Sequence, residues 1–359
     1  MMMTSMRLLK SAKKMRIRHS YRWMPVVVLL ICLSVYLLIQ KPKQVVISKS
    51  TKTTILLWYW PFGVKDYSEN DLCHERFGIR NCMLVDNQSQ FYDADFVIFH
   101  HYELGNRQQK LPLNLIRPQK QRWVWFSQES PENNLNVKSL AGYFNYTMYY
   151  RRDADIYAPY GRMIEKKDLG TEVKVKDLIP KRKTHLACWV VSSFLPNHKR
   201  TAVYQKLSNV IPIVVYGGAV NNSLNSDSLL QTISHCYFYL AFENSIFRDY
   251  ITEKFWYNAF MGGAVPVVLG PPREQYEAVA PKDSFIHVDD FSSIEELGEF
   301  LKKLIVDKER YASYFNWKLK YKVLTNYWIK HLCESCPRFS SLQTPKIYKD
   351  LDAWLWDKA

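Results

Sequence analysis

Two apolar runs separated by the length of one helix constrain the fold of this chain most strongly. The run YFYLAF (237–242) is aromatic, and AVPVVLG (264–270) has the continuous apolar character of a strand buried on both faces. The segment between them has room for one helix, which predicts a βαβ unit. Because ligands of open parallel sheets bind at the carboxyl ends of the strands, ENSIFRDY (243–250) is expected to lie at a binding site.

Further apolar runs of strand length occur on both sides of this unit. They are TILLWYW (54–60), FVIFHH (96–101), WVWFSQES (123–130), LACWVVS (186–192), IPIVVYG (211–217) and SFIHVD (284–289). A charged segment, 161–184, interrupts the series, and we interpret it as a linker. The pattern predicts an α/β fold with two Rossmann-like domains, 54–160 and 185–330. Ser292 and Glu295 have capping-box spacing, which predicts the start of a helix there.

The positive charge of the chain is concentrated at its N-terminus. The formal net charge is +15, but the 12 Lys and Arg residues before Asp66 stand without a single acid. The rest of the chain carries 37 bases against 34 acids. A body that is nearly balanced in charge does not favour nucleic acid as a partner.

An apolar segment follows the first basic cluster. The run from Met24 to Ile39 is just long enough to span a bilayer, and the basic residues before it favour a cytoplasmic N-terminus. We therefore predict a cytoplasmic tail (1–22), a transmembrane signal anchor (23–40), a stem (41–53) and a lumenal body. A cleavable signal peptide is disfavoured because IQKPKQ offers no small-residue exit site. The short span suits the thin membranes of the Golgi or the endoplasmic reticulum.

Cysteines and glycosylation sequons agree with a lumenal body. Cys32 lies in the predicted anchor, and six cysteines follow it: Cys73, Cys82, Cys188, Cys236, Cys333 and Cys336. An even number in an oxidising compartment favours disulfides over a redox motif or half a zinc site at C-E-S-C. Pairing between sequence neighbours would leave the two domains covalently independent. Asn87, Asn145 and Asn221 each begin an N-x-S/T sequon.

The polar residues between the two opening runs fit a sugar nucleotide. A helix from Asp249 to Phe260, beginning near Arg248, would direct free backbone N–H groups at an anion. Lys254 could bind a phosphate, while Glu243, Asn244 and Glu253 could bind hydroxyl groups. The alternative is that Glu253 and Lys254 lie on a solvated helix face and Asn244 in a turn.

The same stretch resembles the signature of the animal α-1,3-fucosyltransferases. The matching segments are FENS (242–245), DYITEK (249–254), VPVVLG (265–270), WPFG (60–63), HH (100–101), ESP (129–131), YRRDAD (150–155), CWVVS (188–192) and C-E-S-C (333–336). The resemblance extends over about residues 54–340 and implies a GT-B architecture, two Rossmann-like domains facing across a cleft. It also implies a type II Golgi enzyme that moves L-fucose from GDP-fucose, with inversion, to GlcNAc of N-acetyllactosamine-type glycans on glycoproteins or glycolipids, giving Lewis x or sialyl Lewis x products.

The resemblance also implies roles for individual residues. Glu129 is the base that takes the acceptor proton. The donor is bound by Tyr160, Val190, Ser192, Ser193, Arg200, Tyr239, Asn244, Tyr250, Glu253 and Lys254. Because Arg200 and Lys254 would neutralise the departing diphosphate, no cofactor is required, although a divalent metal could stimulate. We assign no metal to the D-x-D triplets at Asp93–Asp95 and Asp153–Asp155. The implied disulfides are Cys73–Cys333, Cys82–Cys336 and Cys188–Cys236, which return a C-terminal segment (331–359) to the first domain.

The acceptor side is less well defined. Val64, Tyr102 and Glu103 occupy positions where the family places acceptor-side residues, but this chain departs from common family patterns there. The preference for type 1 or type 2 chains, and for sialylated or neutral acceptors, therefore stays open. His100 and His101 are expected to be structural. Two alternatives remain, a lumenal glycan-binding protein of the same fold without turnover and a GT-B transferase that uses another acceptor.

Overall fold

The computed structural model describes residues 52–65, 72–167, 173–192, 194–325, 328–342 and 346–357. The predicted tail, the anchor (23–40) and nearly all of the stem lie outside these residues, as do Cys32 and Ser193. Within the described part of the chain, no helix has both the length and the apolar character needed to cross a membrane.

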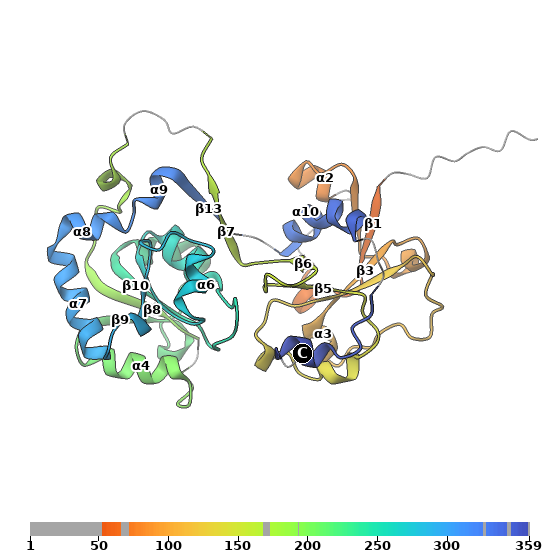
Figure 1. Ribbon diagram of the computed structural model, residues 1–359, viewed down its shortest axis with the longest axis horizontal. Coiled ribbons are helices and arrows are strands. Elements are labelled where there is room, and N and C mark those ends of the chain that lie inside the picture. Colours follow the sequence, from red (N-terminus) through yellow and green to blue (C-terminus); the bar gives the residue numbers. More distant parts are fainter. Residues whose placement is uncertain are drawn as a thin grey trace, which may run out of the picture. The chain divides into compact units, whose positions relative to one another are not determined.

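The first of two parallel sheets contains the strands of the N-terminal half (Figure 1). Its order is β2-β1-β3-β4-β5-β6, with every neighbouring pair parallel. The strands are β1 (Thr53–Leu57), β2 (Cys82–Val85), β3 (Phe96–His100), β4 (Arg122–Phe126), β5 (Tyr146–Tyr149) and β6 (Ile156–Tyr157). The sequence predicted β1, β3 and β4. It missed the other three, which are at most four residues long.

The second parallel sheet has the order β12-β11-β10-β8-β9. Its strands are β8 (His185–Val190), β9 (Ile213–Tyr216), β10 (Cys236–Phe242), β11 (Val265–Leu269) and β12 (Ile286–His287). Each coincides with a predicted apolar run. All five residues of β11 are buried, which confirms that this strand is covered on both faces. The predicted α/β class with parallel sheets is thus confirmed.

Alternating side chains of β10 pack into two different layers. Phe238, Leu240 and Phe242 face a cluster that includes residues of α4 (Lys199–Ser208) and α7 (Ile294–Val306). Tyr239 and Ala241 face the opposite cluster, which includes residues of η7 (Lys254–Met261), a π-helix.

The shorter helices are α2 (Leu72–Phe77), α3 (His101–Gly105), α5 (Ser226–Ser234), α6 (Arg273–Glu277), α8 (Lys308–Ser313) and α9 (Trp317–Lys320). The 3₁₀ turns are η1 (Pro61–Gly63), η2 (Gln88–Tyr92), η3 (Pro131–Asn133), η4 (Val137–Leu140), η5 (Val175–Leu178), η6 (Gly218–Val220) and η8 (Val288–Asp290).

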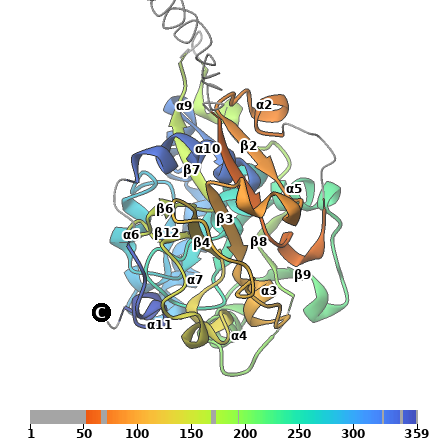
Figure 2. The ribbon, with the colours of Figure 1, turned by 90° about the vertical axis from the view of Figure 1, so that its right-hand side faces the viewer.

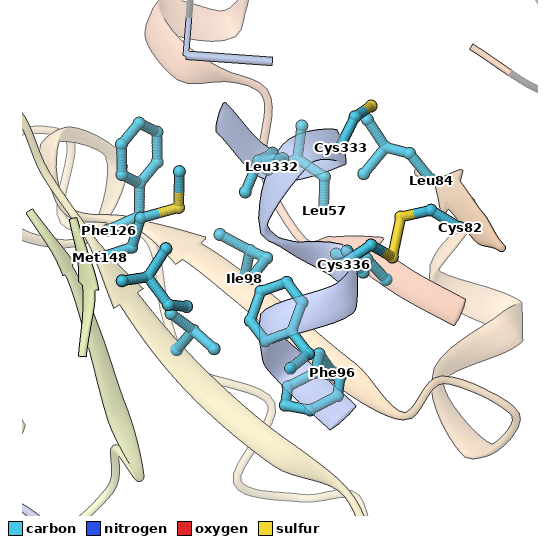
Figure 3. Close-up of a cluster of buried hydrophobic side chains, with 14 of the residues drawn as sticks. Leu57, Cys82, Leu84, Phe96, Ile98, Phe126, Met148, Leu332, Cys333 and Cys336 are labelled. Carbon is cyan, nitrogen blue, oxygen red and sulfur yellow. A yellow bond between two sulfur atoms is a disulfide. The ribbon is translucent and has the colours of Figure 1, made fainter. Parts of the chain in front are cut away.

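The C-terminal segment completes the core around the first sheet. Helix α10 (Trp328–Ser341) lies over the strands near β1 and β2 in both views (Figures 1 and 2). Its buried Leu332 and Phe339 join the cluster that contains Phe96 and Ile98 (Figure 3). Helix α11 (Leu351–Leu355) packs into the cluster on the other face of the sheet. Each apolar face of the sheet is therefore covered in part by residues more than 200 positions away along the chain.

Two disulfides link that C-terminal segment to the first sheet. Cys73–Cys333 joins α2 to α10. Cys82–Cys336 joins β2 to α10 (Figure 3). Cys188–Cys236 joins β8 to β10 inside the second sheet. These are the pairings that the family resemblance implied, and the alternative between sequence neighbours is not the one present.

Two local expectations differ from the structure. Part of the predicted linker forms strand β7 (Gly161–Glu165), which pairs antiparallel with β13 (Tyr321–Thr325). Helix α7 is capped one residue later than predicted, because the Ser293 side chain accepts from the Glu296 N–H while Ser292 donates to the Glu296 carboxylate. No local pattern showed the β7–β13 pairing, since its strands are separated by more than 150 residues in sequence.

The sequon at Asn145 is closed in the folded protein. Asn145 is 4% exposed, its Nδ2 donates to the Lys346 carbonyl at 2.9 Å, and its Oδ1 accepts from the Trp123 N–H at 2.9 Å. Nδ2 is the atom that would carry a glycan, so the prediction for Asn145 is wrong for the folded state. Asn87 and Asn221 are exposed.

Candidate active site

The segment after β4 presents Glu129 with a fixed backbone and a lightly bonded carboxylate. Its carbonyl accepts from the Tyr149 hydroxyl at 2.7 Å and from Asn134 Nδ2 at 3.0 Å. Its Oε2 accepts from Asn133 Nδ2 at 3.1 Å, the single side-chain donor to this carboxylate within the described residues. The half-buried carboxylate therefore retains lone pairs that can accept a hydrogen bond from a substrate hydroxyl.

The loop after β10 is longer than the sequence suggested. The helical segment starts at Glu253 and not near Arg248, and residues 244–252 form an irregular loop. Asp249 has a φ of 60°, in the left-handed region, which is incompatible with a right-handed helical turn at that position. The expected helix N-terminus near Arg248 is therefore wrong by about one turn.

Glu243 and Lys254 close this loop at its two ends. The Glu243 carboxylate is fully buried and accepts from the Thr252 N–H at 2.8 Å, from Thr252 Oγ1 and from Lys254 Nζ at 3.2 Å. Lys254 Nζ also contacts Glu253 at 3.0 Å, and its side chain is 16% exposed. Glu243 is thus saturated by protein donors and not available to a sugar hydroxyl, contrary to expectation. Lys254 is also not on a solvated helix face.

Burial and charge act in opposite directions on these groups. Burial raises the pKa of Glu243 in spite of the Lys254 ammonium. Burial lowers the pKa of Lys254, but the Glu243 and Glu253 carboxylates outweigh it and raise this pKa above its usual value. Burial also opposes ionisation of Glu253, yet Lys254 keeps the pKa of that carboxyl below its usual value. The Lys254 ammonium therefore pairs with both carboxylates, of which the Glu253 side chain is half-exposed and that of Glu243 is fully buried.

Two tyrosines, Tyr160 after β6 and Tyr250 in the loop after β10, lie near each other at the candidate site. The Tyr160 hydroxyl donates to the Gln128 carbonyl at 2.6 Å, and its ring centroid is 6.3 Å from that of Tyr250. Burial raises the pKa of both tyrosines, and the negative charge of Glu129 contributes to both shifts. Ser130, next to Glu129, donates to Ser245 of the loop after β10 at 3.1 Å. The ends of β4 and β10 therefore meet at one site.

The remaining donor residues surround the same loop. Arg200, in the first turn of α4, is 8% exposed, and burial lowers its pKa while the charges of Glu243 and Tyr250 oppose that change. The Tyr239 hydroxyl accepts from Asn258 Nδ2 at 2.8 Å. Asn244 Oδ1 is buried and has no hydrogen-bond partner among the described residues. Val190 packs against the cluster around Tyr239, and Ser192 is exposed.

The three acceptor-side candidates gather around Phe62. Val64 is 54% exposed, and the Tyr102 ring lies 4.9 Å from that of Phe62. Glu103 differs from expectation because it is buried and its Oε2 is 2.6 Å from His100 Nδ1, which makes it a partner of His100 and not a surface acid. Arg107, which the sequence did not single out, donates to the Phe62 carbonyl at 2.8 Å.

His101 is structural, as the sequence suggested. Trp125 Nε1 donates to His101 Nδ1 at 2.9 Å, which leaves the proton on Nε2 to bond the Leu135 carbonyl at 2.9 Å. Burial lowers the pKa of His101 to about 4. With both nitrogens occupied, this imidazole is not a candidate base.

One aspartate of each D-x-D triplet is engaged by protein groups. Asp95 accepts from the Thr54 N–H at 2.9 Å, and Asp153 pairs with Arg151 and Arg248. Across the described ranges, no group of three or more His, Cys, Asp or Glu residues has an arrangement that could hold a metal ion.

Sequence reasoning missed the bonds that join residues of the first sheet's loops to the loop after β10. Ser130 Oγ donates to Ser245 Oγ at 3.1 Å, and Ser245 Oγ donates to Glu132 Oε2 at 2.7 Å. Arg152 pairs with Asp249 at 2.7 Å. Several of these residues fall inside the quoted motifs, but a motif does not show which distant side chains its members contact.

Parallel sheets with polar loops at their carboxyl ends, buried cations and a lightly bonded carboxylate define an α/β protein whose candidate site lies at the ends of its strands. Two family models match the chain, "Fucosyltransferase, N-terminal" over residues 50–161 and "Glycosyltransferase family 10 (fucosyltransferase) C-term" over residues 180–354. The chain belongs to glycosyltransferase family 10, the fucosyltransferases.

Relatives and solved structures agree with this assignment. The chain is 43% identical over 304 residues to alpha-(1,3)-fucosyltransferase 7 of Bos taurus, covering 84% of this chain and 86% of the relative. It is 42% identical to 4-galactosyl-N-acetylglucosaminide 3-alpha-L-fucosyltransferase 9 of Mus musculus, covering 85% and 83%. A crystal structure of an α1,3-fucosyltransferase with GDP-fucose has a TM-score of 0.52 at 21% identity, covering 83% of this chain and 93% of that one, which shows a similar fold.

Proposed function

We propose that this protein is an inverting α-1,3-fucosyltransferase. It transfers L-fucose from GDP-fucose to the GlcNAc of N-acetyllactosamine-type glycans on glycoproteins or glycolipids, with products of the Lewis x or sialyl Lewis x type. The names of the relatives and the GDP-fucose in the neighbouring crystal structure support the reaction. The observation that carries the proposal is that the segment holding Glu129 bonds to the loop that holds Lys254: Ser130 donates to Ser245 at 3.1 Å, and Tyr160 donates to the Gln128 carbonyl at 2.6 Å.

In the proposed reaction, Glu129 takes the proton of the GlcNAc hydroxyl as that oxygen attacks the anomeric carbon of fucose. The bond from that carbon to the diphosphate breaks in the same displacement, which inverts the anomeric centre. Arg200 and Lys254 stabilise the negative charge that develops on GDP. Because Lys254 is already fixed by Glu243 and Glu253, it needs little reorganisation to do so.

The remaining donor residues have contact roles in the proposal. They are Tyr160, Val190, Ser192, Ser193, Tyr239, Asn244, Tyr250 and Glu253. Asn244 Oδ1 supports this because a buried oxygen that lacks a protein partner is satisfied once a ligand hydroxyl donates to it. On the acceptor side we propose exposed Val64 and Tyr102 as contact residues, with Glu103 acting through His100.

The proposal includes an architecture and a location. The two sheets correspond to two Rossmann-like domains of a GT-B enzyme, and residues 23–40 anchor the protein as a single-pass type II protein of the Golgi membrane with a lumenal body. The basic cluster before the apolar run from Met24 to Ile39 supports this orientation. Protease protection of the body in intact Golgi vesicles tests it.

The direct test uses the full-length protein in detergent with GDP-fucose and an N-acetyllactosamine acceptor. We expect a product heavier by one fucose, with the α-1,3 linkage to GlcNAc established by NMR. Matched type 1, type 2 and sialylated acceptors then define the preference. Binding of the acceptor without turnover would favour the glycan-binding alternative, and transfer to a different acceptor class would favour another transferase.

A further inference from the structure

The loop between β10 and η7 has its most constrained residue at Asp249. The φ of 60° at Asp249 lies in the left-handed region, which residues other than glycine adopt only when their surroundings hold them there. The Asp249 side chain is 8% exposed. A buried carboxylate on a left-handed residue therefore needs an explanation from its contacts.

Among the described residues, the hydrogen bonds to the Asp249 carboxylate come from Arg152. Arg152 Nε and Nη2 are 2.9 and 2.7 Å from Oδ1, and the Arg152 backbone N–H is 3.1 Å from Oδ2. Arg152 lies between β5 and β6 of the first sheet. On the other side, the Asp249 N–H donates to Gln275 Oε1 at 2.6 Å, and Gln275 lies on α6, whose Tyr276 packs in the core of the second sheet. Asp249 is thus bonded to elements of both sheets.

The conformation of Asp249 determines how Tyr250 leaves the turn. Tyr250 is 2% exposed, and its ring centroid is 4.9 Å from that of Tyr150 and 6.3 Å from that of Tyr160. A change of backbone direction at Asp249 would move Tyr250 out of this stack. Tyr250 is one of the residues proposed to bind the donor, whereas neither Asp249 nor Arg152 has been given a substrate contact.

We propose that the Arg152–Asp249 pair is a positioning latch, which fixes the left-handed turn and so holds Tyr250 in place for GDP-fucose. The inference rests on the proposed function. It differs from a purely structural ion pair because its loss should act on donor binding more than on folding or on the chemical step.

The test compares the full-length wild-type protein with Asp249→Gly, Asp249→Asn and Arg152→Gln. Glycine adopts the left-handed turn without strain, so Asp249→Gly removes the hydrogen bonds between the carboxylate and Arg152 without straining the backbone. We expect the KM for GDP-fucose and the Kd for GDP to rise by about tenfold in Asp249→Gly and Arg152→Gln, the scale of a charge-assisted hydrogen bond, with kcat nearly unchanged. Asp249→Asn should lose less, because its amide oxygen still accepts a bond from Arg152.

Arg162→Gln is the matched control, because Arg162 pairs with Glu334 at 3.0 Å and joins β7 to α10 away from this loop. Its KM should equal that of the wild type. The double variant Arg152→Gln/Asp249→Gly should be no worse than either single variant, since both remove the same interaction. Amide hydrogen exchange over residues 246–252 should speed up in the latch variants and not in the control.

The proposal is overturned if the latch variants have the KM of Arg162→Gln, or if they lose thermal stability while KM stays normal. Should Asp249→Gly not fold, Arg152→Gln decides the question alone, because the Arg152 side chain is 44% exposed and its loss leaves no buried cavity. A wild-type protein that does not transfer fucose contradicts the proposed function instead. In that case the exchange measurement still decides whether the pair fixes the loop.

Discussion

Two glutamates follow two buried strands of this protein in similar sequence contexts, yet the structure gives them opposite environments. Glu129, after β4, is half-buried and accepts one hydrogen bond on its carboxylate from the described residues. Glu243, after β10, is fully buried and accepts from Thr252 and Lys254. A carboxylate whose lone pairs are already used by the protein stabilises a loop, whereas one with free lone pairs near the site can take part in chemistry. The apolar run before each residue does not distinguish the two cases.

Removal of the cation beside Glu243 is expected to have the largest effect on stability. Lys254→Ala leaves the Glu243 carboxylate buried without its counter-charge, which should lower the free energy of unfolding by about 3–5 kcal/mol. It should also weaken both GDP and GDP-fucose, because Lys254 is proposed to act on the diphosphate. Urea unfolding and calorimetric titration with GDP measure the two effects.

The control for that variant is Lys302→Ala. The pair between Lys302 and Glu299 has side chains that are 43% and 53% exposed, so its loss should cost less than about 1 kcal/mol. If Lys254→Ala were as stable as Lys302→Ala and bound GDP normally, the distinction between a structural Glu243 and a reactive Glu129 would be contradicted.

A second prediction tests whether the imidazole of His331, on α10 against the first sheet, competes with Glu129 as the base. His331 Nε2 is 2.7 Å from the Pro159 carbonyl, and burial lowers the pKa of His331 from 6.5 to about 4. The unfolded chain therefore binds more protons between these values, so this group makes the protein less stable as pH falls from 6.5 to about 4. The loss is about 3 kcal/mol for a shift of this size.

The variant His331→Gln should flatten that part of the stability curve while leaving kcat unchanged. Chemical unfolding at a series of pH values measures the first effect, and the transfer assay measures the second. A large fall in kcat with an unchanged pH dependence of stability would make His331 a rival to Glu129. His101 titrates in the same window, so some pH dependence should remain in the variant.

The sequence predicted the features that a short stretch of residues determines by itself. Every strand of the second sheet was found from its apolar run, because strands buried on both faces have few polar residues. The position of Glu129 and the segment 242–254 came from motifs that resemble a known family. The late start of η7 was not predicted, because it depends on the left-handed turn at Asp249, which Arg152 and Gln275 hold from distant parts of the chain.

Other features depend on contacts that no short window contains. The burial of Asn145 follows from its bonds to Trp123 and to Lys346, which is 201 residues away. The assignment of Glu243 to a sugar hydroxyl was wrong because residue type alone does not show that Thr252 and Lys254 occupy its oxygens. Sequence thus pointed to candidate residues, while the structure shows which of them are bonded by the protein and which keep free lone pairs.

The central claim is that Glu129 is the base of a fucosyl transfer, and the most direct measurement is the steady-state rate of Glu129→Gln with GDP-fucose and N-acetyllactosamine. Glutamine preserves the size and the Asn133 contact but cannot take a proton. The account predicts that kcat falls by at least about a hundredfold while the Kd for GDP and the unfolding midpoint match the wild type. Glu132→Gln, at the neighbouring acid that bonds Ser245, should lose far less. A Glu129→Gln protein with near-normal turnover would contradict the account.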